Sequence, residues 1–214
     1  ALSPDGKILF ASNFLSLEVI DVSNRESPKL LGSYVHDLKP GYVASKASLA
    51  VSKDGKTVFA ASYGFQIFDV SNPSKIELIS SEINPLKLSA VAMHQDGKTL
   101  FFGSKSLKIY DASDPRSLKL LCDFPTKGSI HSILLSHDSK TLFSIGAWGK
   151  TLIHGLKYDT AIVESINVSQ LTNPEILNTY PEMTFLTDPH YLLGITPDEQ
   201  FLFIKNIAPA NKLR

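Results

Sequence analysis

Three residues in the second half of the chain could together hold a catalytic metal ion. His131, Asp188 and His190 offer two imidazoles and a carboxylate, which are donors that zinc and similar divalent ions accept. A metal held there would polarise a water molecule or a carbonyl group. The positions that match His131 in two earlier repeats of the chain hold Ala47 and Ser89. A full ring of metal ligands is therefore not predicted, and hydrogen-bonded scaffold histidines remain the alternative.

The second group of chemically capable residues lies in residues 147–161, AWGKTLIHGLKYDTA. This stretch contains Trp148, the only tryptophan of the chain, together with Lys150, His154 and Tyr158. A large aromatic ring beside cations and a titratable imidazole is typical of a contact with a ligand or a protein partner. The same composition also suits an additional hairpin packed over the edge of a sheet. Three further residues are predicted on the same face of the molecule: Phe14, Tyr63 and Lys105.

Aspartates recur in short turns, and at first sight they could be taken for metal ligands. The turns are Pro4-Asp5-Gly6-Lys7, Lys53-Asp54-Gly55-Lys56, Gln95-Asp96-Gly97-Lys98, His137-Asp138-Ser139-Lys140 and Pro197-Asp198-Glu199-Gln200. Asp-Gly between apolar runs indicates a hairpin, because glycine accepts a positive φ and aspartate bonds nearby amides. The aspartates are therefore predicted to have a role in the turns. No metal site is predicted from them.

These turns belong to a repeat that organises the whole chain. Ile-Asp-Val-Ser at residues 20–23 returns as Phe-Asp-Val-Ser at 68–71, Tyr-Asp-Ala-Ser at 110–113 and Ile-Asn-Val-Ser at 166–169. A period near 42 residues fits a four-stranded blade. In the second copy, strands are predicted over residues 47–52, 57–62, 65–70 and 76–83, with very little helix anywhere. The fold class is therefore all-β, a β-propeller of four-stranded antiparallel blades with four blades and a partial fifth.

The quoted copies also resemble a known family. IDVSNRESPKLLGSY, FDVSNPSKIELI, YDASDPRSLKLL and INVSQLTNPEIL are similar to the LVIVD repeat, an apolar strand ending in Asp, then Val-Ser-Asn/Asp-Pro and a second apolar strand. The copies depart from the pattern at Asn167, and in the proline positions at Arg25, Ile76, Leu118 and Leu171. The resemblance implies propeller blades and favours an extracellular or cell-surface location. It implies no particular activity.

The repeat divides residues 1–214 into units of approximately 1–41, 42–84, 85–127, 128–185 and a partial 186–214 within one propeller region. The two ends of the chain duplicate one strand of the blade and do not complement each other. We therefore expect an incomplete propeller, a fragment of a larger one. The strand edges left open at each end would favour self-association.

Composition excludes several classes of function. Lysine plus arginine and aspartate plus glutamate both number 21, so no net field favours nucleic acid or an anionic membrane. No apolar run is long enough for a membrane span, and the single Cys122 predicts no disulfide framework. Common motifs for nucleophiles, metals and phosphates are missing, and no cofactor is predicted.

Three readings of the function follow from these observations. The first is a non-enzymatic interaction module that binds a protein or a glycan through the face carrying the B-to-C and D-to-A loops, where A to D are the four strands of a blade. The alternative is a propeller enzyme, a lactonase-like hydrolase or a quinoprotein-like oxidoreductase, with a metal or cofactor over the channel near His131, Asp188 and His190. A purely structural spacing role is the third reading.

Overall fold

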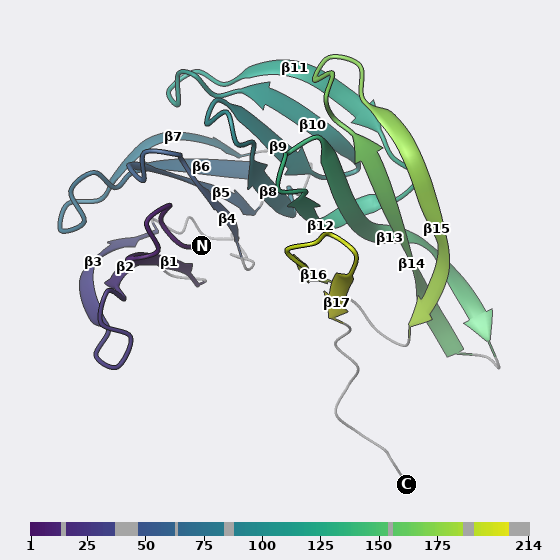
Figure 1. Cartoon of the computed structure of the whole chain (residues 1–214), viewed down its shortest axis with the longest axis horizontal. Helices are drawn as coiled ribbons and strands as arrows, with labels where there is room; N and C mark the ends of the chain where they lie inside the picture. Colours follow the sequence, from purple (N-terminus) through teal and green to yellow (C-terminus); the bar gives the residue numbers. More distant parts are fainter. Residues whose placement is uncertain are drawn as a thin grey trace, which may run out of the picture. The chain divides into compact units, whose positions relative to one another are not determined.

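The structure is a computed structural model, and it describes residues 1–13, 16–36, 47–62, 64–83, 88–153, 156–185 and 191–205. Over these residues the regular structure is entirely β, in agreement with the predicted all-β class. Figure 1 shows the strands in chain order from purple to yellow. No helix among the described residues is long and apolar enough to cross a membrane.

The strands form five antiparallel sheets. The first sheet contains β1 (Ile8–Ser12), β2 (Ser16–Asp21) and β3 (Lys29–Val35). The second contains β4 (Ser48–Val51), β5 (Thr57–Ser62), β6 (Gly64–Asp69) and β7 (Glu77–Ile83). The third contains β8 (Ala90–Met93), β9 (Thr99–Gly103), β10 (Ser106–Asp111) and β11 (Lys119–Pro125). The fourth contains β12 (Ser129–Leu135), β13 (Thr141–Ile153), β14 (Leu156–Asn167) and β15 (Glu175–Phe185), and the fifth contains β16 (Tyr191–Ile195) and β17 (Leu202–Lys205).

Three of the sheets have the four-stranded meander predicted for a blade. The predicted strands of the second repeat agree with β4 to β7 within one or two residues. The chain separates into two compact bodies. The N-terminal body contains Ala1–Phe102 and Ile109–Leu120, and the C-terminal body contains Gly103–Lys108 and Leu121–Arg214. The predicted single region and its unit boundaries stay predictions.

In the N-terminal body, the sheets pack face to face through apolar side chains. Phe10 and Val19 of the first sheet share a core with Val58 and Phe68 of the second. The opposite face of the second sheet has its own core, in which Phe59 and Ile67 pack with Leu100 and Phe102 of the third. Strand β5 is therefore apolar at almost every position because both of its faces are covered.

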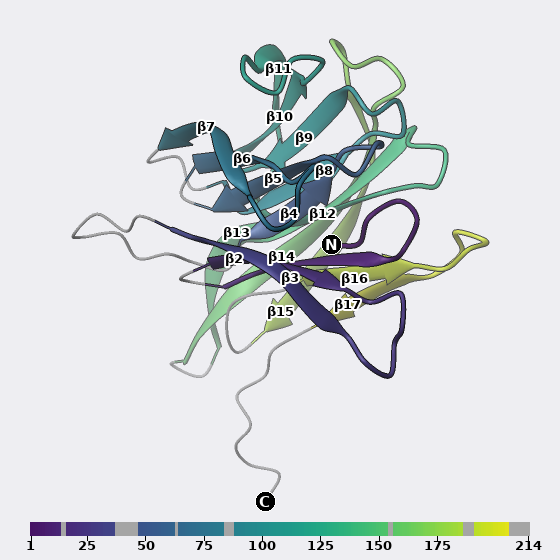
Figure 2. The ribbon, with the colours of Figure 1, turned by 90° about the vertical axis from the view of Figure 1, so that its left-hand side faces the viewer.

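In the C-terminal body, the fourth sheet packs against the fifth. Ile145 and Val163 lie in one core with Leu202 and Ile204 of β17. The fourth sheet also has the longest strands of the molecule, with 13, 12 and 11 residues in β13, β14 and β15. Figure 2 shows these three strands running side by side.

Candidate functional site

In four of the five sheets, the turn between the first two strands is built by a serine or threonine two positions before the aspartate. Asp54 accepts a hydrogen bond from the Ser52 hydroxyl at 2.6 Å and one from the Lys56 amide at 3.0 Å. The Ser52 oxygen in turn accepts the Thr57 amide at 2.9 Å. Three other turns have the same arrangement, around Asp5, Asp138 and Asp198.

These bonds confirm that the aspartates serve the turns. The hydrogen bond from Ser52 and then that from the Lys56 amide lower the pKa of Asp54, because they stabilise its charged form. Asp5 and Asp198 have lowered pKa values for the same reasons, with Ser3 and Thr196 as the largest causes. In the third sheet His94 takes the place of the serine, and its Nδ1 accepts the Asp96 amide at 3.1 Å. No group of three or more potential metal ligands occurs in the part of the chain that the structure describes.

The second set of turns, after the third strand, is capped as predicted. The carboxylate of Asp69 accepts the Ser71 amide at 2.9 Å. Asp21, Asp111 and Asn167 accept the amides of Ser23, Ser113 and Ser169 in the same way. The sharing of this local geometry by the four copies supports the alignment of the repeat.

Two of the turns between the first and second strands of a sheet lack glycine at the residue that adopts a positive φ. Gly6, Gly55 and Gly97 have φ values of 69°, 73° and 71°, whereas Ser139 and Glu199 occupy the matching positions with φ values of 56° and 58°. A side chain in this region of φ is strained. Glycine would avoid this strain at residues 139 and 199.

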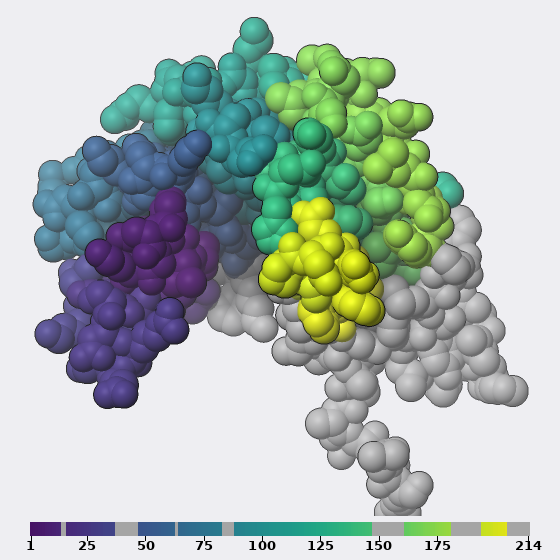
Figure 3. All heavy atoms as spheres, viewed as in Figure 1, coloured from purple at the N-terminus to yellow at the C-terminus, as the bar shows by residue number. Residues whose placement is uncertain are grey.

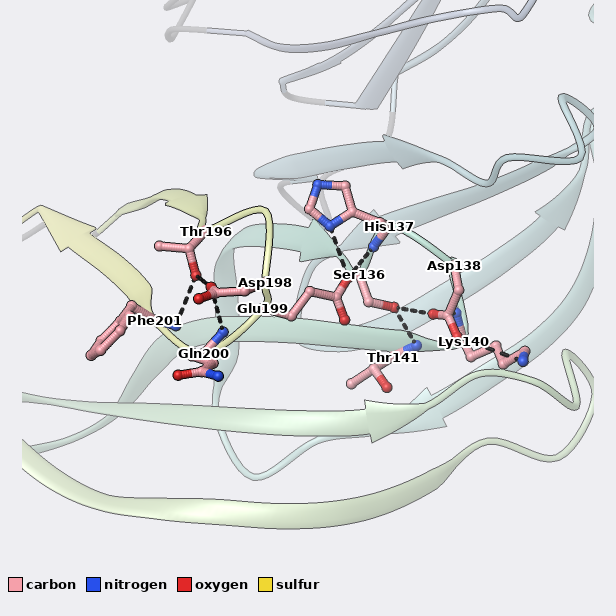
Figure 4. A network of polar contacts seen from close by, with 10 residues as sticks. All are labelled: Ser136, His137, Asp138, Lys140, Thr141, Thr196, Asp198, Glu199, Gln200 and Phe201. Atoms are coloured by element: carbon pink, nitrogen blue, oxygen red, sulfur yellow. Dashed lines mark hydrogen bonds and ion pairs between the residues drawn. The ribbon is translucent and has the colours of Figure 1, made fainter.

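Glu199 also makes a contact with another turn (Figure 4). One carboxylate oxygen accepts the His137 backbone amide and lies 3.0 Å from the His137 Nδ1 atom. The two residues belong to the turns of the fifth and fourth sheets, so the contact joins neighbouring sheets within the C-terminal body. This contact is a polar link between two turns. The spacing of residues in the sequence gave no signal for it.

The opposite end of the C-terminal body carries the loops. We call residues 103–106, residues 126–128 and the hairpin 147–161 the loop end. At residues 103–106, Lys105 is exposed at the tip of the turn, as predicted. Beside it, Asp123 accepts hydrogen bonds from the Ser106 hydroxyl and the Lys108 ammonium group. Partial burial opposes the effect, but these two bonds lower the pKa of Asp123.

A buried carboxylate lies beneath residues 126–128. Glu164 of β14 is only 1% exposed. Its cross-strand partners are Ser144 on β13 and Thr179 on β15, which share its face of the sheet. The Lys127 amide lies 3.4 Å from one carboxylate oxygen. Burial raises the pKa of Glu164, because the charged form loses its hydration, and the Lys127 amide and charge only partly offset this effect.

Residues 147–161 continue the fourth sheet. The pairing of β13 with β14 runs from Thr141↔Asn167 to Ile153↔Leu156, with an irregularity between Ala147 and Gly149. Strand β15 follows the extension as far as Asp159↔Phe185. The stretch therefore forms a hairpin, and its two arms elongate the fourth sheet. Strand β14 therefore starts at Leu156, well before the segment 163–169 that aligns with residues 17–23 of the first repeat.

The pairing of β13 with β14 gives the backbone positions of three residues that were predicted to contact a partner. Trp148 lies at the irregularity, next to the Ser129↔Ala147 pair that opens β12. Lys150 and Tyr158 follow on the paired arms of the extension, opposite Asp159 and Thr151. Their side chains, like those of all residues 147–153 and 156–160, lie outside the described part. His154, Tyr63, Phe14, Asp188 and His190 also lie outside the described residues.

His131 lies on β12 as predicted, near the start of the first strand of its sheet. The register of β12 shifts between Ile130 and Ser132, so His131 is the additional residue of a bulge. Bulges change the direction of a side chain and are frequent next to active sites. Asp188 and His190, which were predicted beside it, lie outside the described residues.

Four-stranded antiparallel meanders that pack face to face define the protein class. The chain has the fold of a β-propeller, and residues 11–36 and 47–82 match the model of the LVIVD repeat. These two stretches of the propeller are similar to LVIVD repeats. Among curated protein sequences, none matches the chain.

Solved structures give the same fold. Hydrazine synthase from Kuenenia stuttgartiensis is similar over 99% of this chain and 57% of its own, with a TM-score of 0.69 and 17% identity. A functionally unknown protein from Desulfotomaculum acetoxidans matches 88% of this chain and 57% of its own, with a TM-score of 0.65 and 15% identity. The periplasmic gluconolactonase of Pseudomonas aeruginosa matches 95% of this chain and 61% of its own, with a TM-score of 0.62 and 14% identity. This chain thus spans about three fifths of the length of these proteins, and at such identities the likeness concerns the fold alone.

Proposed function

We propose that the chain is a non-enzymatic interaction module that binds a protein or a glycan through the loop end of the C-terminal body. The observation that carries this proposal is the elongation of one sheet. β13 and β14 have 13 and 12 residues, whereas the strands of the second sheet have four to seven. The two strands of the hairpin thus extend well beyond the strand length of the second sheet, and a hairpin of this kind can present a binding surface.

The chemistry of the loop end supports the same proposal. Trp148 and Tyr158 bring aromatic rings to the elongated hairpin. Lys105 is exposed, while Asp123 and Lys108 form an ion pair nearby. Aromatic side chains bordered by paired and unpaired charges are the usual composition of protein-binding and glycan-binding surfaces.

The experiment is a binding screen with a matched variant. The purified chain is tested on an immobilised glycan array and against a displayed random peptide library, beside Trp148→Ala/Tyr158→Ala. Leu177→Ala, at an exposed leucine of β15, is the control. We expect at least one glycan or peptide class that the wild type and the control bind and the double variant does not. Failure to bind either library, or equal binding by the double variant, would refute the proposal.

A propeller hydrolase or oxidoreductase is the second candidate. It is supported by the bulge at His131, at the loop end of β12, and by the similarity in fold to a protein named as a gluconolactonase. In this candidate His131, with Asp188 and His190, would hold a metal ion over the channel. Its test is metal analysis of the purified chain together with hydrolysis of glucono-1,5-lactone by the wild type and His131→Ala. Bound metal and turnover that both disappear in the variant would favour the enzyme over the binding module.

A further inference from the structure

Two segments of the loop end are joined through their backbones. The Ile130 amide donates a hydrogen bond to the Ser104 carbonyl oxygen at 2.6 Å, so the turn at 103–106 lies beside the segment around 126–130 within the C-terminal body. Each segment carries an exposed lysine, Lys105 on the first and Lys127 on the second. The described part of the loop end therefore presents two ammonium groups on adjoining segments.

The two carboxylates described near these lysines are either paired or buried. Asp123 forms an ion pair with Lys108, and Glu164 is only 1% exposed. Among the residues that the structure describes, neither Lys105 nor Lys127 forms an ion pair. The positive charge of these two lysines is therefore available to a ligand.

The loop end as a whole is basic, although the complete chain has a formal net charge of zero. Its residues 103–106, 126–128 and 147–161 contain four lysines and one aspartate, which give a net charge of +3. The sum stays positive even when Glu182 and Asp188, from the chain that follows the hairpin, are added to it. The charged residues of the loop end are Lys105, Lys127, Lys150, Lys157 and Asp159.

The turns at the other end of the same body carry the opposite charge. We call residues 136–140, 167–175 and 196–200 the turn end, and they contain four acidic residues and one lysine: Asp138, Glu175, Asp198, Glu199 and Lys140. Figure 3 shows the yellow atoms of the fifth sheet at the surface beside the green atoms of the fourth. An anionic ligand would therefore be attracted to the loop end and repelled by the turn end.

The side chains of the loop end favour a glycan over a protein as this anionic ligand. The centre of a protein interface is usually rich in apolar and aromatic side chains. Residues 103–106 and 126–128 consist only of glycine, serine, threonine and lysine. Hydroxyl and ammonium groups suit a ligand that is itself covered with hydroxyl and acidic groups. Trp148 and Tyr158 of the hairpin add rings of the kind that pack against the apolar face of a sugar.

We propose that the ligand of the loop end is an acidic glycan, a polysaccharide with carboxylate or sulfate groups, and that Lys105 and Lys127 bind those groups. This inference rests on the proposed function, because it names the class of ligand for the same site. Ammonium groups form charge-assisted hydrogen bonds with such anions. Salt screens exposed pairs of this kind, so binding is expected to weaken as the ionic strength rises.

The test is calorimetric titration of the whole chain with four probes: polygalacturonate, dextran sulfate, uncharged dextran and polyglutamate. Lys105→Gln/Lys127→Gln removes the two charges of the loop end. Lys75→Gln/Lys140→Gln is the matched control, because it removes two exposed lysines from turns. Trp148→Ala/Tyr158→Ala is titrated in parallel, so that the proposed function is tested separately from the class of ligand.

We expect the wild type and the control to bind polygalacturonate or dextran sulfate, and to bind neither dextran nor polyglutamate. The loop-end lysine variant should bind about tenfold more weakly, since two exposed ion pairs contribute about that much to affinity. A preference for dextran or polyglutamate, no binding of any probe, or equal affinities of the lysine variant and the control would overturn the acidic glycan. Unchanged binding by the aromatic variant would instead refute the proposed function.

Discussion

Glu199 contacts both the backbone amide and the imidazole of His137, a residue 62 positions earlier in the chain. The contact joins the turns of two consecutive sheets. It also explains why glutamate occupies a position at which three other turns have glycine. The strain of a positive φ at Glu199 is balanced by hydrogen bonds that glycine could not make.

Replacement of Glu199 should separate these two effects. Glu199→Ala keeps the strained φ and loses the carboxylate, so it should lower the free energy of unfolding by about 1 kcal/mol. Glu199→Gly loses the same contact but relieves the strain, and it should lie close to the wild type. Urea unfolding of the three proteins measures the difference. Equal losses in the alanine and glycine variants would show that the backbone at residue 199 stores no strain.

The turn aspartates predict a loss of stability in acid. Asp54 and its equivalents have pKa values below the ordinary 3.8 in the fold. Between the ordinary pKa and the lowered values, the unfolded chain therefore binds more protons than the folded chain. The contribution of these aspartates to stability is fully present above the ordinary pKa, and it is lost as the pH falls through the lowered values.

Thermal unfolding between about pH 5 and pH 2 should show a steep fall in midpoint below about pH 4. Ser52→Ala, which removes the largest cause of the shift at Asp54, should make that fall shallower. A midpoint that is independent of pH in this range would contradict the assignment.

Glu164 should act in the opposite direction. Burial raises its pKa in the fold, so between the ordinary value of 4.5 and the raised pKa the folded chain holds a proton that the unfolded chain has lost. Stability therefore falls as the pH rises from 4.5 through the raised pKa. Glu164→Gln should therefore be more stable than the wild type at pH 7, by on the order of 1 kcal/mol. The gain should disappear near pH 4. A less stable variant at pH 7 would mean that the Lys127 charge outweighs the cost of burial.

Two glycines of the C-terminal body form a matched pair. A Cβ atom at Gly146 would lie 2.1 Å from the Ser129 carbonyl oxygen, whereas one at Gly194 would meet nothing within 4 Å. Gly146→Ala should thus lower the free energy of unfolding by about 2 kcal/mol, and Gly194→Ala should change it by less than about 0.5 kcal/mol. Equal effects in chemical unfolding would contradict the close packing of β12 on β13.

Much of the fold could be predicted from local sequence. Asp-Gly turns and the Ile-Asp-Val-Ser repeat are local signals, and they placed strands such as β5 correctly. The role of the serine two positions before each aspartate was missed, although its spacing was visible. Ser52 and Thr196 read as ordinary strand-end residues until their hydrogen bonds to the aspartates are known.

The remaining features depend on contacts that the sequence does not encode locally. The elongation of β14 consists of its pairing with β13 as far as Ile153↔Leu156, and β15 follows it only to Asp159↔Phe185. The burial of Glu164 contrasts with the matching Glu18 and Lys108, which are only partly buried, so an alternating pattern could not single it out. The polar contact between His137 and Glu199 joins two turns that are far apart in the chain.

The hairpin extension allows the most direct test of the proposed function. Residues 148–160 are replaced by Asn-Gly, which shortens β13 and β14 to the length of an ordinary blade and keeps the Ala147↔Ala161 pair. The glycan or peptide selected in the screen is then titrated calorimetrically into the shortened chain and into the Leu177→Ala control. We predict no binding to the shortened chain and unchanged affinity for the control. Unchanged affinity for the shortened chain would contradict a binding site at the loop end.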